Sequence, residues 1–187
     1  MSEASSELEL LKAIAGGDSL ALKKLFARHN VRVFRFIVRV VRNDALAEEI
    51  VNEVFVDVWR HAGRYEGRSA PLTWILAIAH NKARSALRKR TEDAIDEDKM
   101  GEIADESDTP EIIAQKGDTG AALRQCLEKL SREHREIIDL VYYHERSVEE
   151  ASEILGIPEG TVKTRMFHAR KKLAELLTRA GIDRGWP

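Results

Sequence analysis

The sequence predicts an all-α protein: two small helical domains joined by a flexible acidic linker. Apolar residues recur at helical spacing along most of the 187 residues, and no segment shows the alternating pattern of a strand. Hydrophobic residues make up 43% of the chain but aromatic residues only 6%, which is typical of compact helical units. The formal net charge is only −2, yet the charges are segregated along the chain, which indicates separate units.

The first domain is predicted over residues 6–91 as consecutive amphipathic helices. Asp18 follows two glycines and is a good N-cap for a long helix, and Asp44 is expected to cap the next one. In that next helix Trp59 is expected in the core. Polar residues at helical spacing are expected to point outward, namely Glu49, Asn52, Glu53 and Asp57.

A loop with two glycines and a proline precedes the last helix of this domain, which Pro71 opens and which is expected to run to about Arg90. The exposed face of this helix combines an aromatic ring with cations: Trp74, His80, Asn81, Arg84 and Arg88. Such a face suits unpaired bases, because any base stacks on a ring while cations hold the phosphates. From spacing alone, core packing of Trp74 and a solvated role for the arginines are alternatives.

Residues 92–118 are predicted to form the linker. They contain eleven acidic residues against two lysines, whereas residues 60–90 contain eight cations against Glu66 alone. The acidic stretch has few large apolar residues, so it cannot bury enough surface to offset the entropy of ordering.

The second domain, predicted over residues 119–180, contains a helix-turn-helix pattern. Ser147 and Glu150 form a capping box, Gly156 ends the first helix, and Pro158 begins the second. The outward face of the second helix mixes cations, hydroxyls and an aromatic ring, which suits phosphate and base-edge contacts in a major groove. Its residues are Thr161, Lys163, Thr164, Phe167, His168 and Lys171. An ordinary helical hairpin with a solvated basic face is the alternative.

Catalysis finds little support, because the six histidines are scattered without metal-ligand spacing and no glycine-rich phosphate loop follows a strand. We expect no cofactor and no metal. The single Cys126 excludes an internal disulfide and favours a reducing cytoplasm, and no apolar run is long enough to span a membrane.

An ordinary helix-turn-helix regulator with an N-terminal partner-binding domain is a further alternative. Such a protein binds duplex DNA and does not need the tryptophan and arginine face.

The order of motifs strongly resembles the extracytoplasmic-function group of bacterial RNA polymerase sigma factors over about residues 6–178. The motifs are DALAEEIVNEVFVDVWRH, then PLTWILAIAHNKARSALRKR, the acidic stretch, and LEKLSREHREIIDLVYYHERSVEEASEILGIPEGTVKTRMFHARKKL. In that family the first domain, region two, binds the clamp helices of the largest polymerase subunit and opens the minus-10 element. The second, region four, binds the minus-35 element and the flap of the beta subunit. The resemblance therefore implies core RNA polymerase, promoter DNA and an anti-sigma factor as partners.

The resemblance also implies residue roles. It places core polymerase binding on Glu49, Asn52, Glu53 and Asp57. It places minus-10 binding on a loop and the helix after it: Arg64, Tyr65, Glu66, Gly67, Arg68, Ser69, Trp74, His80, Asn81, Arg84 and Arg88. It places minus-35 binding on Thr161, Lys163, Thr164, Phe167, His168 and Lys171. His168 departs from the arginine that many relatives have, so the preferred minus-35 sequence is open.

Overall fold

The computed structural model describes residues 3–96 and 119–182, and every regular element in those ranges is helical. The all-α prediction is confirmed. The N-terminal half consists of α1 (Glu3–Ala15), α2 (Ser19–Val41), α3 (Asp44–His61), the short 3₁₀ turn η1 (Ala62–Arg64) and α4 (Pro71–Asp96). The C-terminal half consists of α6 (Thr119–Glu128), α7 (Arg132–Ile138), the π-helical turn η2 (Asp139–Tyr143), α8 (Val148–Leu155) and α9 (Glu159–Arg179). Most of the predicted linker, residues 97–118, lies outside the described residues.

The helix caps follow the sequence with one correction. Asp18 caps α2 as predicted, accepting hydrogen bonds from the backbone N–H groups of Leu20 at 2.8 Å and Ala21 at 3.2 Å. The cap of α3 is Asn43 rather than Asp44, and its side chain accepts from the Leu46 N–H at 2.8 Å. Asn43 is in the extended conformation of an N-cap, so Asp44 takes the first helical position, where the helix dipole favours a negative charge.

The core of the N-terminal half lies among α2, α3 and α4, with Phe36, Val54 and Leu76 fully buried. The prediction that Trp59 points into this core is wrong, because its side chain is 38% exposed. The buried stripe of α3 runs through Val51, Val54, Phe55 and Val58, and Trp59 falls at its edge.

α4 continues to Asp96, six residues beyond the predicted end. Thr91 Oγ1 donates to the Leu87 carbonyl at 3.0 Å, and Arg88 lies 3.8 Å from Glu92 one turn later. Such local contacts support an exposed helix where no core does, and apolar periodicity does not register them.

The helix-turn-helix is confirmed in the C-terminal half. Ser147 and Glu150 form both bonds of the capping box, and Gly156 ends α8 in the left-handed conformation at φ 64°. Pro158 is the residue before the first turn of α9. The buried side of α9 consists of Val162, Ala169, Leu173 and Leu177.

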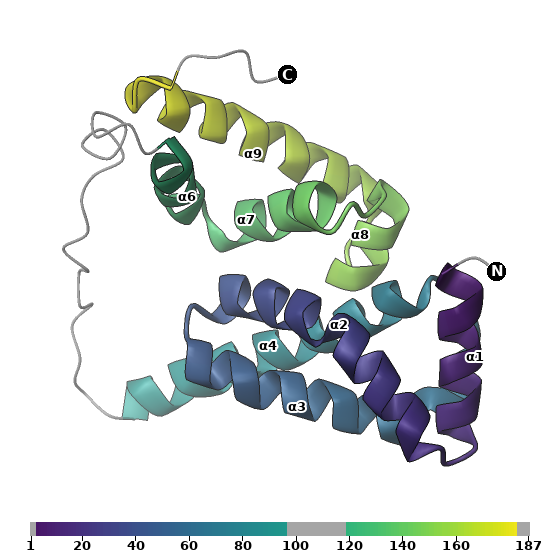
Figure 1. Cartoon of the computed structure of the whole chain (residues 1–187). Coiled ribbons are helices and arrows are strands. Elements are labelled where there is room, and N and C mark those ends of the chain that lie inside the picture. The colour runs from purple at the N-terminus through teal and green to yellow at the C-terminus, as the bar shows by residue number, and fades with distance from the viewer. Residues whose placement is uncertain (1–2, 97–118, 183–187) are drawn as a thin grey trace.

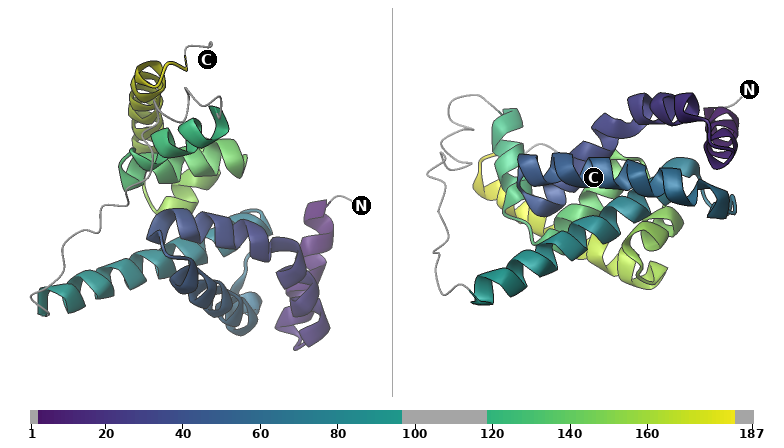
Figure 2. Two further views of the ribbon diagram at one scale, coloured as in Figure 1. Left: turned by 60° about the vertical axis from the view of Figure 1, so that its left-hand side comes forward. Right: turned by 90° about the horizontal axis from the view of Figure 1, so that it is seen from below.

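The two halves pack directly against each other. α8 lies on α4 and α7 lies on α2, while α9 is on the side away from the N-terminal half (Figures 1 and 2). The loop and first turn of α4 are therefore close to the first helix of the helix-turn-helix.

Candidate polymerase and nucleic-acid interfaces

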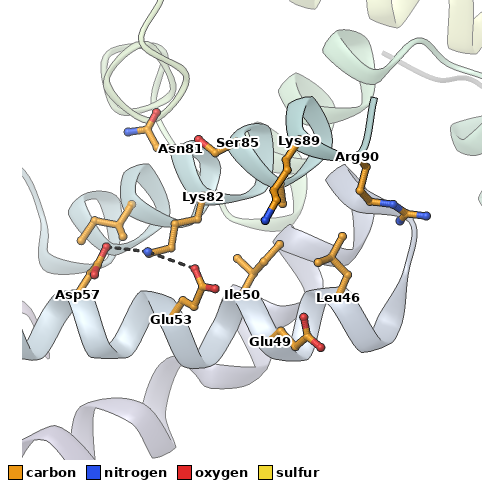
Figure 3. Close-up of a pocket in the computed structure, with 12 residues that line it drawn as sticks. Leu46, Glu49, Ile50, Glu53, Asp57, Asn81, Lys82, Ser85, Lys89 and Arg90 are labelled. Atoms are coloured by element: carbon orange, nitrogen blue, oxygen red, sulfur yellow. Dashed lines mark hydrogen bonds and ion pairs between the residues drawn. The ribbon is translucent and has the colours of Figure 1, made fainter. Parts of the chain in front are cut away.

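Three surfaces carry the residues singled out in the sequence. The first is the α3 acidic face, which consists of Glu49, Asn52, Glu53 and Asp57. It borders an open groove of about 720 Å³ between α3 and α4. Lys82 reaches across this groove from α4, and its Nζ lies 2.9 Å from Asp57 and 3.3 Å from Glu53 (Figure 3).

These ion pairs divide the α3 acidic face into two parts. Burial favours a lower pKa for the Lys82 ammonium, but Asp57 and Glu53 outweigh it and raise that pKa, so Lys82 stays charged. Glu53 and Asp57 therefore already share a cation, which the sequence pattern does not indicate. Glu49 and Asn52 are exposed on the same face.

The second surface is the loop–α4 surface, which consists of the loop 64–69 with Trp74, Asn81, Arg84 and Arg88. Its aromatic part is built by Tyr65 and Trp74, whose half-buried rings lie 5.3 Å apart. The Tyr65 hydroxyl donates to the Ser69 carbonyl and closes the loop. Gly67 makes the turn at φ 71°, a conformation that glycine adopts without a steric cost.

The polar part of the loop–α4 surface is open to solvent. Asn81, Arg84 and Arg88 are exposed, and Figure 3 shows Asn81 pointing away from α3 while Lys82 points toward it. The expectation that His80 shares this face is wrong, because His80 is only 2% exposed. The helical period turns it toward the C-terminal half, where its Nε2 lies 3.5 Å from Glu136.

The third surface is the α9 outer face, which consists of Thr161, Lys163, Thr164, Phe167, His168 and Lys171. All but the half-buried Thr161 are exposed, and Phe167 is 64% exposed, which is unusual for a large aromatic ring. The Phe167 and His168 rings meet edge to face, with centroids 5.4 Å apart. The ring and the cations thus lie side by side at one end of α9.

A basic groove of about 440 Å³ continues from this face between α7 and α9. Its lining includes Lys129, His134, His168, Lys171 and Lys172, against Glu175. Burial, followed by the neighbouring His168, lowers the pKa of His134, so the positive charge of the groove comes from its lysines. Because of these lysines, the side of α9 beyond the exposed ring is suited to phosphate rather than to base edges.

Two further features were not predicted. Glu153 of α8 contacts Ser69 of the loop and Glu150 contacts Thr73 in the first turn of α4, and Glu136 and Asp139 are buried where α7 and η2 meet the N-terminal half. Their partners in the N-terminal half are 56 to 100 residues away in the chain, a separation at which periodicity and capping patterns carry no signal.

Within residues 3–96 and 119–182, no group of three or more His, Cys, Asp or Glu side chains is arranged to hold a metal ion. No helix in the same ranges has the length and apolar character needed to cross a membrane.

Comparison with known proteins identifies both halves. Residues 25–92 match sigma-70 region 2 and residues 120–173 match sigma-70 region 4. The chain is 37% identical over 166 residues to the RNA polymerase sigma factor CarQ of Myxococcus xanthus, covering 86% of this chain and 91% of CarQ. It is 30% identical over 177 residues to the ECF RNA polymerase sigma factor SigK of Mycobacterium tuberculosis, covering 92% of this chain and 95% of SigK.

Two solved structures have the same fold. One is the sigma factor RpoE in complex with the anti-sigma factor NepR from Bartonella quintana, with a TM-score of 0.70 and 27% identity over 87% of this chain and 98% of RpoE. The other is CnrH in complex with the cytosolic domain of CnrY, with a TM-score of 0.68 and 24% identity over 93% of this chain and 98% of CnrH.

The helical halves with their helix-turn-helix, together with these matches, define a two-region sigma factor. The chain belongs to the extracytoplasmic-function (ECF) group of RNA polymerase sigma factors. It is a transcription initiation factor that binds core RNA polymerase and directs initiation at specific promoters.

Proposed function

We propose that each surface carries one step of initiation. The α3 acidic face binds the clamp helices of the largest polymerase subunit, and the α9 outer face reads the minus-35 element. The loop–α4 surface, with Asn81 at its centre, captures an unpaired minus-10 base and so aids strand opening.

One observation carries the minus-10 assignment: Asn81, Arg84 and Arg88 are exposed along one helix that starts beside the paired rings of Tyr65 and Trp74. An unpaired base needs a stacking partner, an edge contact and cations for its phosphate, and these residues offer all three. Stacking contributes about 1 to 3 kcal/mol per base, comparable with the few kcal/mol that flipping a base costs.

The minus-35 assignment is supported by the position of the exposed residues on α9. In helix-turn-helix docking, the N-terminal part of the second helix reaches the base edges. Lys163, Thr164, Phe167 and His168 lie in that part, and the C5-methyl group of thymine suits contact with an exposed aromatic ring.

We also propose that an anti-sigma factor is a partner and that the chain acts in the cytoplasm, where RNA polymerase works. The similar structure of RpoE with NepR supports the first point. The single buried Cys126, which needs no oxidising compartment, fits the second.

The minus-10 assignment is tested with Asn81→Ala in the holoenzyme. We expect open-complex formation on duplex promoters to decrease by about 5- to 150-fold, which corresponds to a loss of about 1 to 3 kcal/mol of binding free energy for the unpaired base. Partial rescue is expected on a template with a pre-melted bubble, because the cost of opening is then removed. Permanganate footprinting measures opening on the duplex template, and run-off transcription measures initiation on both templates.

The matched control is Asn52→Ala, the same chemical change on the α3 acidic face. A variant with weaker polymerase binding loses activity equally on duplex and bubble templates. The same equal loss for Asn81→Ala would contradict the role of Asn81 in capturing an unpaired base.

A further inference from the structure

The basic groove between α7 and α9 contains a half-buried histidine that none of the three surfaces uses. His134 lies in the first turn of α7, where its backbone N–H donates to the N-cap hydroxyl of Ser131 at 3.3 Å. It lines the groove together with His168 of α9, and its ring forms no hydrogen bond within residues 3–96 and 119–182. The His134 ring is therefore available to a ligand that enters the groove.

The carboxylates at this groove already have partners, which leaves the groove with an excess of positive charge. Glu133 Oε1 of α7 lies 3.0 Å from Arg165 Nη2 of α9. Glu175 Oε2 lies 3.6 Å from Lys172 Nζ, both on α9. The exposed lysines of the groove that form no ion pair in the described part of the chain are Lys129 and Lys171. The groove therefore suits an anion such as a phosphate, whose oxygens accept charge-assisted hydrogen bonds.

The groups around His134 keep its ring neutral in the free groove. Burial and, next, the neighbouring His168 lower its pKa from 6.5. Arg165 acts in the same direction, and the adjacent Glu133 opposes it without outweighing burial. A phosphate in the groove adds negative charge, and an opposite charge nearby raises the pKa of a histidine. An anion that binds here therefore brings a proton with it.

The groove lies on the flank of the helix that is proposed to read base edges. A major groove of DNA is about 12 Å wide, and an α-helix with its side chains is about 10 to 12 Å across. A helix in that groove consequently has its flanks against the backbone phosphates. His168 and Lys171 belong both to the α9 outer face and to the basic groove, so the two sites are continuous.

We propose that His134 is a further minus-35 contact: its protonated ring donates a hydrogen bond to a backbone phosphate in the basic groove, so that DNA binding takes up a proton. The inference rests on the proposed minus-35 role of the α9 outer face. Affinity for the minus-35 element then increases as the pH falls from 8 to 6, because the bound form holds the proton more tightly than the free form. A rise of one unit in the pKa of His134 corresponds to as much as about 10-fold in affinity.

The proposal is tested with holoenzyme that contains the full chain. The probe is a promoter duplex with the minus-35 element that the holoenzyme selects from a random pool, at constant salt in buffers without phosphate. Between pH 8 and pH 6, the affinity of unaltered holoenzyme is expected to rise about 3- to 10-fold more than that of the His134→Gln variant. The two are expected to bind alike at pH 8. His134→Lys, which is always charged, is expected to bind more tightly than the unaltered chain at pH 8 and to show no more pH dependence than His134→Gln.

Two control variants separate the titration of His134 from the loss of a charge and from the loss of any histidine. Lys129→Gln removes a fixed cation from the same groove and is expected to weaken binding by the same factor at pH 8 and pH 6. His61→Gln alters a half-buried histidine of α3, outside the minus-35 surface, and is expected to leave the pH dependence unchanged. Equal pH dependence of the unaltered and His134→Gln holoenzymes would overturn the proposal.

The phosphate is located by replacing single minus-35 phosphates with neutral methylphosphonates. One position is expected to remove the extra pH dependence of the unaltered holoenzyme and to cause no pH-dependent loss in His134→Gln. The absence of such a position would contradict the contact between His134 and the DNA backbone. At pH 8 His134 does not contribute, so equal binding there to promoters with and without the minus-35 element would instead contradict the assignment of the α9 outer face.

Discussion

Single side chains on the α3 acidic face differ in how available they are to a partner. The sequence shows four polar residues on one helix face and gives no reason to separate them. The structure separates them, because Lys82 already pairs with Glu53 and Asp57, whereas Glu49 and Asn52 face solvent. Lys82 belongs to the next helix, α4, whereas helical periodicity indicates only which residues of one helix share a face. The sequence pattern therefore does not predict these ion pairs.

This difference selects the residue to test for polymerase binding. We expect Glu49→Lys to weaken binding to core polymerase by about 10-fold, or about 1.4 kcal/mol, because it reverses an exposed charge without breaking the pairs around Lys82. Competition with labelled unaltered chain for core polymerase measures the affinity. Glu48→Lys changes the neighbouring exposed acid on a different side of α3 and is expected to compete normally. Equal affinities for the two variants would remove the α3 acidic face from the interface.

A buried histidine in the N-terminal half predicts a pH dependence of stability. His29 is buried with its Nε2 2.8 Å from Glu7, and burial lowers its pKa from 6.5 despite the nearby carboxylate. The unfolded chain therefore binds a proton more readily than the folded chain. Stability is complete above the unfolded value and falls as the pH drops below about 6.5 toward the folded pKa.

We expect urea unfolding of the unaltered chain to show a decreasing free energy of unfolding between pH 7.5 and pH 5. In His29→Gln, which cannot titrate, that decrease is expected to be smaller, although the variant is less stable at neutral pH because the site is closely packed. The comparison uses the slope with pH and not the absolute stability. Identical slopes would show that His29 does not contribute to the pH dependence.

At the scale of elements, α9 combines two kinds of contact along one helix. Lys163 lies on the α9 outer face and Lys172 lines the basic groove further along. Each is exposed and each pairs with a glutamate on the same helix, Lys163 with Glu159 at 3.9 Å and Lys172 with Glu175 at 3.6 Å. Exposed pairs of this kind contribute little to stability. Alanine at either position is therefore expected to change DNA binding without changing the stability of the fold.

We expect Lys163→Ala to lose about 1 to 3 kcal/mol of discrimination at particular minus-35 positions. We expect Lys172→Ala to weaken binding evenly across sequences and to reduce the salt slope by about one unit. Selection from a library of minus-35 variants, repeated at several salt concentrations, measures both effects. A changed sequence preference with Lys172→Ala but not with Lys163→Ala would reverse the proposed orientation of α9 in the groove.

The local elements were predicted well where the physical cause is local. Asp18, the capping box of α8 and the glycine that ends it all act within four residues, and the structure confirms each. The errors at Asp44 and Trp59 have a common origin, because each depends on how the neighbouring turn or helix is placed, which sets which of two adjacent residues becomes the cap or reaches the core. The end of α4 has a different origin, because side-chain contacts within an exposed helix extend it beyond the apolar stripe.

At the scale of the whole molecule, the sequence predicts two halves joined by a linker but does not predict that they pack. Arg39 and Asp139 are 100 residues apart, and Thr73 and Glu150 are 77 apart. Glu150 has a sufficient local explanation in the sequence, because it completes a capping box. Helical spacing likewise places His80 on the loop–α4 surface, whereas its burial depends on Glu136, a residue of the other half.

The packing predicts energetic coupling between the halves, which a double-mutant cycle at Arg39 and Asp139 measures. Asp139 is buried, and its pairing with Arg39 joins α2 to η2. We expect Arg39→Met and Asp139→Asn each to destabilise the chain by about 1 to 3 kcal/mol in urea unfolding, because each leaves the other group without its charged partner. The double variant is expected to lose less than the sum, with a coupling energy of about 0.5 to 3 kcal/mol. Arg35→Met, which alters an exposed arginine one turn earlier on α2, serves as the control and is expected to show no coupling to Asp139→Asn. If the losses in unfolding free energy of Arg39→Met and Asp139→Asn are additive instead, this pair does not hold the two halves together in the free chain.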